Sequence, residues 1–291
     1  MYNLISPRVD SHCHLWRQSR GDYGWLDPQN AALALLLRDF EPSDLQERLA
    51  ASGIESALVV QAAPTVDETR FLLNLAATRP QIAGVVGWVD LADAESVTIL
   101  DELAQDPAFK GVRPMLQDLE QIDWIATSPD PNVVDRMIEL GLRFDALVLA
   151  QHLPHLLSFA KRYPDLPIVV DHAAKPALAD QGDLTNWRAG LLPIATETNA
   201  VCKMSGLLTE MAPVDLERAE AVLKPVVSDL LDWFGPERLM WGSDWPVLKL
   251  AGSYSGWDAL TQKLLSDLSE TDRARILGGT ATEFYGLEDA A

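Results

Sequence analysis

The sequence predicts an α/β protein, a (β/α)8 TIM barrel built as a single domain. Short apolar runs alternate with amphipathic segments along the whole chain, and eight of these runs have the length of a strand. Several are almost continuously apolar, such as Ala-Leu-Val-Val at 57–60, as expected for parallel strands covered on both faces. The length of 291 residues suits one such barrel.

Each predicted strand is followed by a segment with helical periodicity, so the strands should pair in parallel through right-handed crossovers. The predicted strands cover residues 8–12, 56–61, 82–89, 110–113, 143–149, 167–171, 200–204 and 238–242. The first predicted helix begins at Pro42-Ser43-Asp44 and ends at Gly53, because serine and aspartate cap helices and glycine ends them. The later helices cover 65–78, 94–105, 132–140, 152–162, 185–198, 216–234 and 257–268, with short turns at 272–277 and 280–285.

We expect one domain over residues 1–291, since neither a short-period repeat nor a linker rich in Pro, Gly or Ser interrupts the pattern. Two longer connections, residues 18–39 and 116–131, follow the first and fourth strands and should lie at the mouth of the barrel. The sequence contains no Gly-x-Gly-x-x-Gly or Walker-type loop, which argues against an open nucleotide-binding sheet.

The composition of the chain restricts which partners and which cellular location we expect. A net charge of −20, from 43 acidic and 23 basic residues, repels phosphate backbones and anionic membranes, so we expect neither nucleic acid nor membrane as a partner. The only cysteines are Cys13 and Cys202, and so few favour a cytoplasmic protein. No leader opens the sequence, and the longest apolar stretch, 31–37, is too short to cross a bilayer.

Two of the five histidines, His12 and His14, stand two residues apart at the end of the first predicted strand. Residues i and i+2 of a strand point to the same face, while Cys13 points to the other. Two neighbouring imidazoles suit a divalent metal such as zinc. A histidine pair without a ligand role is the alternative.

In a barrel of this kind the active site lies at the C-terminal ends of the strands. Polar residues stand at or just beyond these ends at His12, His14, Gln61, Arg113, His172, Lys203, Ser205 and Asp244. The first and eighth strands are neighbours in a closed barrel, so Asp244 should face the histidine pair. Three histidines and a carboxylate around one space suit metal-assisted hydrolysis. As an alternative, Asp244 could cap the following helix.

Five motifs resemble the amidohydrolase superfamily: Asp-Ser-His-Cys-His-Leu-Trp at 10–16, Gly-Val-Val-Gly-Trp-Val-Asp at 84–90, Lys-Gly-Val-Arg at 110–113, Val-Asp-His-Ala-Ala-Lys-Pro at 170–176 and Gly-Ser-Asp-Trp-Pro at 242–246. Within it they are similar to the lactonase branch, which includes L-fuconolactonases, L-rhamnonolactonases and pyrone-dicarboxylate lactonase. The resemblance runs from about Val9 to Tyr285. It implies a distorted (β/α)8 barrel and the hydrolysis of a cyclic ester.

The resemblance also implies roles for the strand-end residues. Asp244 would be the general base, and His172 would orient or polarise the reacting centre. His12, His14 and Asp244 would hold the metal. No lysine ends the fourth strand, where binuclear relatives carry a carboxylated one, so we expect at most one divalent ion, zinc or manganese, and no organic cofactor.

We expect a small-molecule lactone as the substrate, with a homo-oligomer left open. Its hydroxyl or carboxylate groups would be held by Arg113, Gln61, Gln117 and Lys175, and its ring would stack on Trp25 and Trp245. For Arg113 a structural ion pair is the alternative. Trp88, Trp187, Trp233 and both cysteines are interpreted as packing residues. The resemblance favours the lactone of a 6-deoxy-L-sugar acid, such as L-fucono- or L-rhamnono-lactone.

Three alternatives stay open. The same superfamily contains metal-dependent decarboxylases, which usually add a histidine of the fifth strand as a ligand, and His152 begins a helix near that position. The lactone could instead derive from an aromatic compound, since Pro114 stands where sugar-lactonase relatives carry a polar residue. A non-catalytic sugar-acid binding protein would require Asp244 to be dispensable.

Overall fold

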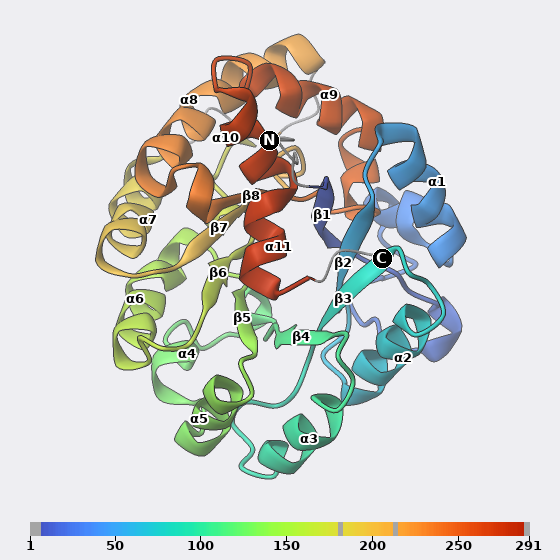
Figure 1. The fold of residues 1–291 in the computed structure, drawn as a ribbon, viewed down its shortest axis with the longest axis vertical. Helices are drawn as coiled ribbons and strands as arrows, with labels where there is room; N and C mark the ends of the chain where they lie inside the picture. The colour runs from blue at the N-terminus through green and yellow to red at the C-terminus, as the bar shows by residue number, and fades with distance from the viewer. Residues whose placement is uncertain (1–6, 180–182, 212–214, 288–291) are drawn as a thin grey trace, which may run out of the picture.

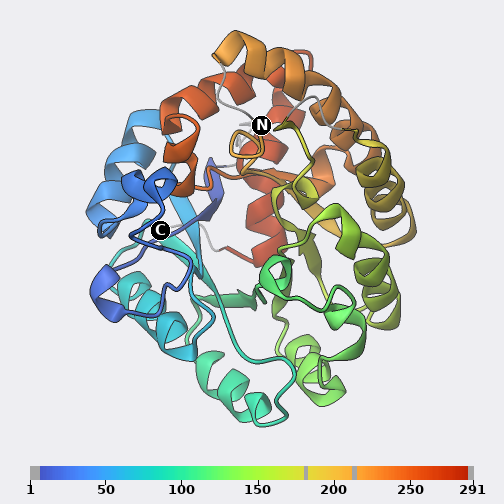
Figure 2. The ribbon, with the colours of Figure 1, turned by 180° about the vertical axis from the view of Figure 1, so that it is seen from behind.

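The computed structural model describes residues 7–179, 183–211 and 215–287. Eight parallel strands pair in the order in which they occur in the sequence and curve into a barrel surrounded by helices (Figures 1 and 2). The predicted (β/α)8 barrel is therefore confirmed. The strands are β1 (Val9–Cys13), β2 (Ser56–Val60), β3 (Ile82–Gly87), β4 (Phe109–Val112), β5 (Arg143–Ala146), β6 (Ile168–Val170), β7 (Val201–Met204) and β8 (Leu239–Trp241).

The helices follow the predicted order. They are α1 (Pro42–Ser52), α2 (Val66–Ala76), α3 (Ser96–Leu103), α4 (Trp124–Thr127), α5 (Pro131–Glu139), α6 (Leu153–Arg162), α7 (Thr185–Glu197), α8 (Leu216–Phe234), α9 (Tyr254–Leu264), α10 (Glu270–Ala274) and α11 (Thr280–Tyr285). Helix α9 begins earlier than the predicted residue 257, because Ser253 caps it by accepting a hydrogen bond from the Gly256 amide. Helix α4 lies inside the connection 116–131, where no helix was predicted.

The barrel closes between β1 and the residues that follow β8. The Asp244 amide donates to the His12 carbonyl and the His14 amide donates to the Trp245 carbonyl, both over 2.7 Å. Gly242 permits this approach, because a Cβ at that position would lie 2.8 Å from the His12 Cβ atom. Closure thus brings the histidine pair beside Asp244.

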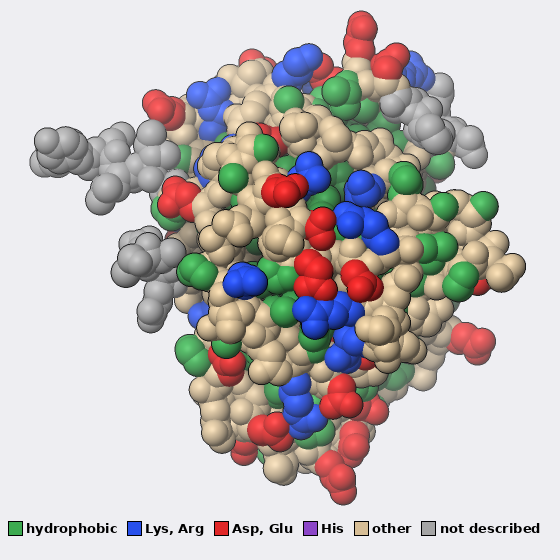
Figure 3. All heavy atoms as spheres, turned by 90° about the vertical axis from the view of Figure 1, so that its right-hand side faces the viewer, with side chains coloured by type: hydrophobic (Ala, Val, Ile, Leu, Met, Phe, Trp, Pro, Cys, Tyr) green, Lys and Arg blue, Asp and Glu red, His purple; other side chains and the backbone are tan. Residues whose placement is uncertain are grey.

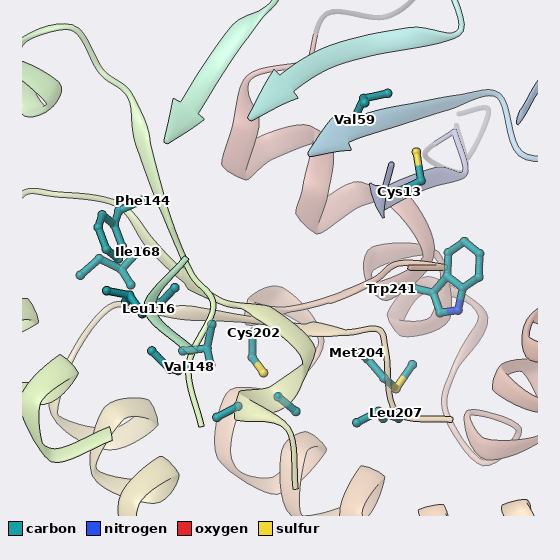
Figure 4. Close-up of a cluster of buried hydrophobic side chains, with 14 of the residues drawn as sticks. Cys13, Val59, Leu116, Phe144, Val148, Ile168, Cys202, Met204, Leu207 and Trp241 are labelled. Atoms are coloured by element: carbon teal, nitrogen blue, oxygen red, sulfur yellow. The ribbon is translucent and has the colours of Figure 1, made fainter. Parts of the chain in front are cut away.

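Side chains alternate along the strands and form two cores. Val59 packs outwards against the helices, in the cluster of which Figure 4 shows part, with Cys13, Phe144 and Trp241. Its neighbours Leu58 and Val60 point into the barrel and form the inner core with side chains of five other strands, and with Ala281 and Tyr285 of α11. Helix α11 lies across one end of the barrel (Figure 1), so the mouth is at the other end.

Basic and acidic side chains intermingle on the side that carries α1 and α2 (Figure 3). Arg70 of α2 lies 3.0 Å from Glu102, and Arg38 lies 3.3 Å from Asp44 of α1. Within the described ranges, no helix combines the length and the apolar character needed to cross a membrane. Cys13 and Cys202 are free and buried, which confirms that both are packing residues.

Candidate active site

His12, His14 and Asp244 meet at the C-terminal end of the barrel. Nε2 of His14 lies 3.3 Å from Oδ1 of Asp244, and Nε2 of His12 lies 3.9 Å from the same oxygen. The three side chains are buried, and one potential ligand atom from each lies within 4.8 Å of the others. The prediction that both imidazoles leave β1 on one side is confirmed, since Cys13 points the other way and its thiol faces the Leu58 carbonyl.

The donor set of this cluster fits one divalent ion. Nδ1 of His14 lies 2.8 Å from the Val60 carbonyl, so that nitrogen carries the proton and leaves Nε2 free to ligate. Nδ1 of His12 lies 3.3 Å from Oδ1 of Asp171. Metal-ligating histidines commonly donate their second N–H to a carbonyl or carboxylate, as His14 does to Val60.

His172 follows β6 and faces the same centre. Its Nε2 lies 3.9 Å from Oδ1 of Asp244, and its Nδ1 lies 2.8 Å from the Ser205 hydroxyl. Gly206 makes room for the ring, because a Cβ there would lie 2.6 Å from Nδ1 of His172. Ser205 and Gly206 of the segment after β7 therefore fix the orientation of this imidazole.

The backbone at both predicted catalytic residues is left-handed. The φ angles run from 49° to 57° across His172, Ala173, Ala174 and Lys175, and φ is 56° at Asp244. Each such residue costs about 1–2 kcal/mol relative to the right-handed region. The turn is held from the outside, since the indole N–H of Trp187 donates to the Ala173 carbonyl over 2.6 Å. Strain of this kind is typical of functional sites.

The surroundings set the charge of these groups. Burial opposes ionisation of Asp244, but the neighbouring imidazoles of His172 and His14 outweigh it and keep the pKa of the carboxyl below its usual value. Burial, together with neighbouring cations such as Lys203, holds the pKa of His12 well below its usual value. Burial also lowers the pKa of His172 strongly. At neutral pH these shifts leave Asp244 as a carboxylate, as a general base requires, and leave the imidazoles of His12 and His172 neutral.

A cavity of about 250 Å³ opens onto this centre. Its polar lining includes His14, His172 and Asp244 together with Arg113, Gln117 and Lys175, and Trp25 contributes an indole. The connections 18–39 and 116–131 supply Trp25 and Gln117, which agrees with their predicted place at the mouth. Lys175 is paired with Glu210 over 3.5 Å.

Two of the residues predicted to hold substrate do not line this cavity. Gln61 is buried beside Arg113, where its amide donates to the Arg113 carbonyl over 2.7 Å and Arg113 donates back to the Gln61 carbonyl. Gln61 therefore braces Arg113. Trp245 is 3% exposed and packs edge-on against Phe40, 5.3 Å away.

The connection after β2 is held by a buried carboxyl group that the sequence did not single out. Glu68, in the first turn of α2, accepts hydrogen bonds from the Ala62 amide over 3.0 Å and the Ala63 amide over 2.7 Å. The Ala62 carbonyl in turn accepts the indole N–H of Trp25 over 2.8 Å. Burial raises the pKa of Glu68 to about 7. Glu68 thus anchors one wall of the cavity.

Below the cavity, inside the barrel, lies a buried charge network. Lys203 of β7 lies 2.5 Å from Asp145 of β5, 3.1 Å from Asp171 and 3.2 Å from Nδ1 of His12. The Tyr285 hydroxyl donates to Asp145 over 2.8 Å. Charged residues within the otherwise apolar strands β5 and β7 were the signal for this network in the sequence.

His152 lies apart from the cluster formed by His12, His14 and Asp244. Its Nδ1 accepts the Leu149 amide over 3.0 Å, so the ring caps the turn before α6. A fifth-strand histidine ligand, as expected for the decarboxylases, is not formed by this residue.

The fold and this centre define a class of protein. The chain belongs to the amidohydrolase family, whose model matches residues 9–287. It is 45% identical to an L-fucono-1,5-lactonase of Burkholderia ambifaria, covering 97% of this chain and 96% of that protein. It is 37% identical to an L-fucono-1,5-lactonase of Burkholderia multivorans, covering 98% of this chain and 97% of that protein. A crystal structure of an amidohydrolase from Burkholderia multivorans with bound zinc superposes with a TM-score of 0.87 at 35% identity, covering 97% of this chain and all of that chain (100%).

Proposed function

We propose that this protein hydrolyses the lactone of a sugar acid, with L-fucono-1,5-lactone as the first candidate substrate. The observation that carries the proposal is the cavity in which Asp244, His14 and His172 stand beside Arg113, Gln117 and Lys175. The 45% identity to an L-fucono-1,5-lactonase over nearly the whole chain supports the same class of substrate.

The cavity suits a single ring. At about 250 Å³ it is smaller than most small-molecule sites, which span about 300–1,000 Å³. Arg113, Gln117 and Lys175 can hold hydroxyl groups and the carbonyl side of a lactone. Trp25, Leu147 and Val247 line the same space, and apolar side chains can pack against the methyl group of a 6-deoxy sugar.

In the proposed mechanism a water molecule between Asp244 and the lactone carbonyl is the nucleophile. Asp244 takes one proton from the water while its oxygen attacks the carbonyl carbon. The bond from that carbon to the ring oxygen then breaks, and Asp244 returns the proton to the departing oxygen. His172 is neutral because of its lowered pKa, so it positions the carbonyl and leaves the proton to Asp244. The product is the open-chain acid.

The proposed cofactor is one divalent ion, zinc or manganese, held by His12, His14 and Asp244. When bound, such an ion supplies Lewis acidity to the carbonyl or to the attacking water. The zinc bound in the homologous amidohydrolase from Burkholderia multivorans supports this choice. No organic cofactor is proposed. A cytoplasmic location also belongs to this proposal.

The other reactions are less favoured by the site. A pyrone dicarboxylate carries two carboxylates and would need several cations, whereas the cavity offers Arg113 and Lys175, and Lys175 is already paired with Glu210. The decarboxylase alternative would use His152 as a ligand, and that ring caps a turn instead.

Steady-state hydrolysis of L-fucono-, L-rhamnono-, D-arabinono- and pyrone-dicarboxylate lactones, followed by acid release, tests the proposal. We expect the highest kcat/KM with a 6-deoxy-L-sugar lactone and none above background with Asp244→Asn. Preference for the pyrone by several orders of magnitude, or release of carbon dioxide without ring opening, would overturn the assignment.

A further inference from the structure

Beside the active-site cavity lies a larger hollow of about 650 Å³, formed by the connection 18–39 and the segments that follow β2, β3 and β4. Three indoles line it, those of Trp25, Trp88 and Trp124. All three are neither fully buried nor fully exposed. The interpretation of Trp88 as a packing residue therefore accounts for only part of its surface.

Contacts outside the hollow fix the indole of Trp25 and the backbone of Trp88. Trp25 donates its indole N–H to the Ala62 carbonyl over 2.8 Å and packs edge-on against Trp16 at 5.4 Å. The Thr69 hydroxyl holds both backbone groups of Trp88, accepting its N–H over 2.8 Å and donating to its carbonyl over 3.1 Å. Preformed aromatic walls cost little ordering on binding, and they suit a flat ring with an apolar face.

The charges of the hollow select against anions. Among the described residues that line it, the charged side chains are Asp90, Asp118 and Asp22, of which Asp22 is paired with Arg20 over 2.6 Å, whereas Arg113 and Lys175 line the active-site cavity. Carboxylates accept hydrogen bonds from hydroxyl groups and repel other carboxylates or phosphates. The ligand of the hollow should therefore be neutral and rich in hydroxyl groups.

The hollow and the active-site cavity are adjacent and share part of their lining. Trp25, Met115 and Asp118 line both of them. The cavity of about 250 Å³ has room for one ring, so any second ring joined to that lactone must leave it, and the hollow lies on the other side of these three residues.

We propose that the hollow is a second subsite, which binds a neutral sugar ring joined by a glycosidic bond to the lactone in the active-site cavity. The inference rests on the proposed lactonase function and extends its substrate class to lactones of disaccharide acids. The glycosidic bond stays intact, and only the lactone ester is opened.

The probes are L-fucono-1,5-lactone and its three derivatives that carry one β-D-galactosyl ring on the 2-, 3- or 4-hydroxyl. Two variants change residues that line the hollow and do not line the active-site cavity: Trp124→Ala removes an indole, and Ala92→Trp fills the space from an exposed position. Trp233→Ala is the matched control, because Trp233 is also partly exposed but packs on Trp187, 5.3 Å away.

With the wild type, we expect at least one galactosyl isomer to have a kcat/KM about tenfold above that of the parent lactone. Trp124→Ala and Ala92→Trp should each reduce that value by about three- to tenfold, the usual effect of one aromatic contact, and leave the parent lactone and the fold unchanged. Trp233→Ala should leave kcat/KM unchanged both for the parent lactone and for the galactosyl isomer.

The subsite proposal is overturned if every galactosyl isomer is hydrolysed more slowly than the parent lactone. It is also overturned if both hollow variants lower the rates for parent and derivative alike. Hydrolysis of none of the four lactones by the wild type has a different meaning: the proposed function itself then fails, and the subsite falls with it.

Discussion

The Nζ atom of Lys203 lies 3.2 Å from Nδ1 of His12, although the two residues come from β7 and β1, which β8 separates in the closed barrel. The same ammonium group lies 2.5 Å from Asp145 and 3.1 Å from Asp171. The candidate metal ligand is therefore supported from below by a charge that the inner core encloses completely. Stability and site geometry depend on the same side chain.

Lys203→Met should destabilise the protein strongly. It leaves Asp145 without its cation and Asp171 with Arg113 alone, 3.9 Å away, and loss of one partner of a buried ion pair costs about 3–5 kcal/mol. Urea unfolding at pH 7 measures this loss. Lys161→Met is the control, because its pair with Glu197 is half exposed and should contribute no more than about 1 kcal/mol. Equal losses in the two variants would contradict the network's role.

Asp244→Asn should abolish most lactone hydrolysis while the protein stays folded. A general base contributes about 10²–10⁴-fold to the rate, and the amide cannot take the proton from water. The measurement is kcat on L-fucono-1,5-lactone, with circular dichroism as the check on folding. A folded variant with wild-type turnover would remove Asp244 from the mechanism.

His14→Ala should reduce the bound divalent metal from at most one ion per chain to a small fraction of that value, because it removes one of the three ligands. Elemental analysis after dialysis against zinc or manganese gives the stoichiometry. His155→Ala, which changes a partly exposed histidine outside the cluster, should leave it unchanged. Two tightly held ions in the wild type would contradict a mononuclear site.

Gly206→Ala should lower kcat at least tenfold. Its added methyl group would lie 2.6 Å from Nδ1 of His172 and displace the ring from Ser205, and errors of about 1 Å in a catalytic group can cost 10²-fold. Gly141→Ala is a matched control, since its φ of 65° is equally left-handed but nothing lies within 4 Å. We expect the control to lose stability and keep its kcat.

Glu68 should make folding stability depend on pH. Its pKa is raised from 4.5 to about 7 in the folded protein, so between these values the folded state binds more protons than the unfolded state. The free energy of unfolding therefore falls as pH rises from about 4.5 to 7, by about 3 kcal/mol for this group. The contribution is nearly complete by pH 8, about one unit above the folded-state pKa.

Unfolding of Glu68→Gln at pH 5 and pH 8 checks this sign. Its unfolding free energy should change between the two pH values by about 3 kcal/mol less than that of the wild type. Glu47→Gln, at a side chain 74% exposed, should follow the wild type. A wild-type stability that rises over this range, with no difference from Glu68→Gln, would show that the carboxyl is not destabilised by burial.

The alternation of apolar runs with amphipathic segments was sufficient to predict the barrel, because a strand that is buried on both faces consists almost entirely of apolar residues. The rule that the active site of a barrel lies at the C-terminal ends of its strands likewise predicted a common site for residues from distant parts of the chain: His12, His14, His172 and Asp244. Helix ends were harder to predict, as α9 shows: its cap, Ser253, stands before the first residue of the periodic apolar pattern.

The rest depended on tertiary contacts that periodicity does not encode. Gln61 and Arg113 both end strands, and only the folded backbone shows that Gln61 braces Arg113. Trp245 adjoins Asp244, yet in the folded chain it packs against Phe40, away from the cavity. Lys203 and Asp145 lie in different strands, so their pairing inside the barrel is visible only after closure.

Helix α11 has a consequence for the order of events during synthesis. It follows all eight strands in the sequence, yet it covers one end of the inner core and supplies the Tyr285 hydroxyl that donates to Asp145. A nascent chain that has emerged only as far as β8 leaves Val9, Leu58 and Met240 open to water at that end. The chain must therefore emerge from the ribosome as far as α11 before water can be excluded from the inner core beneath the active site.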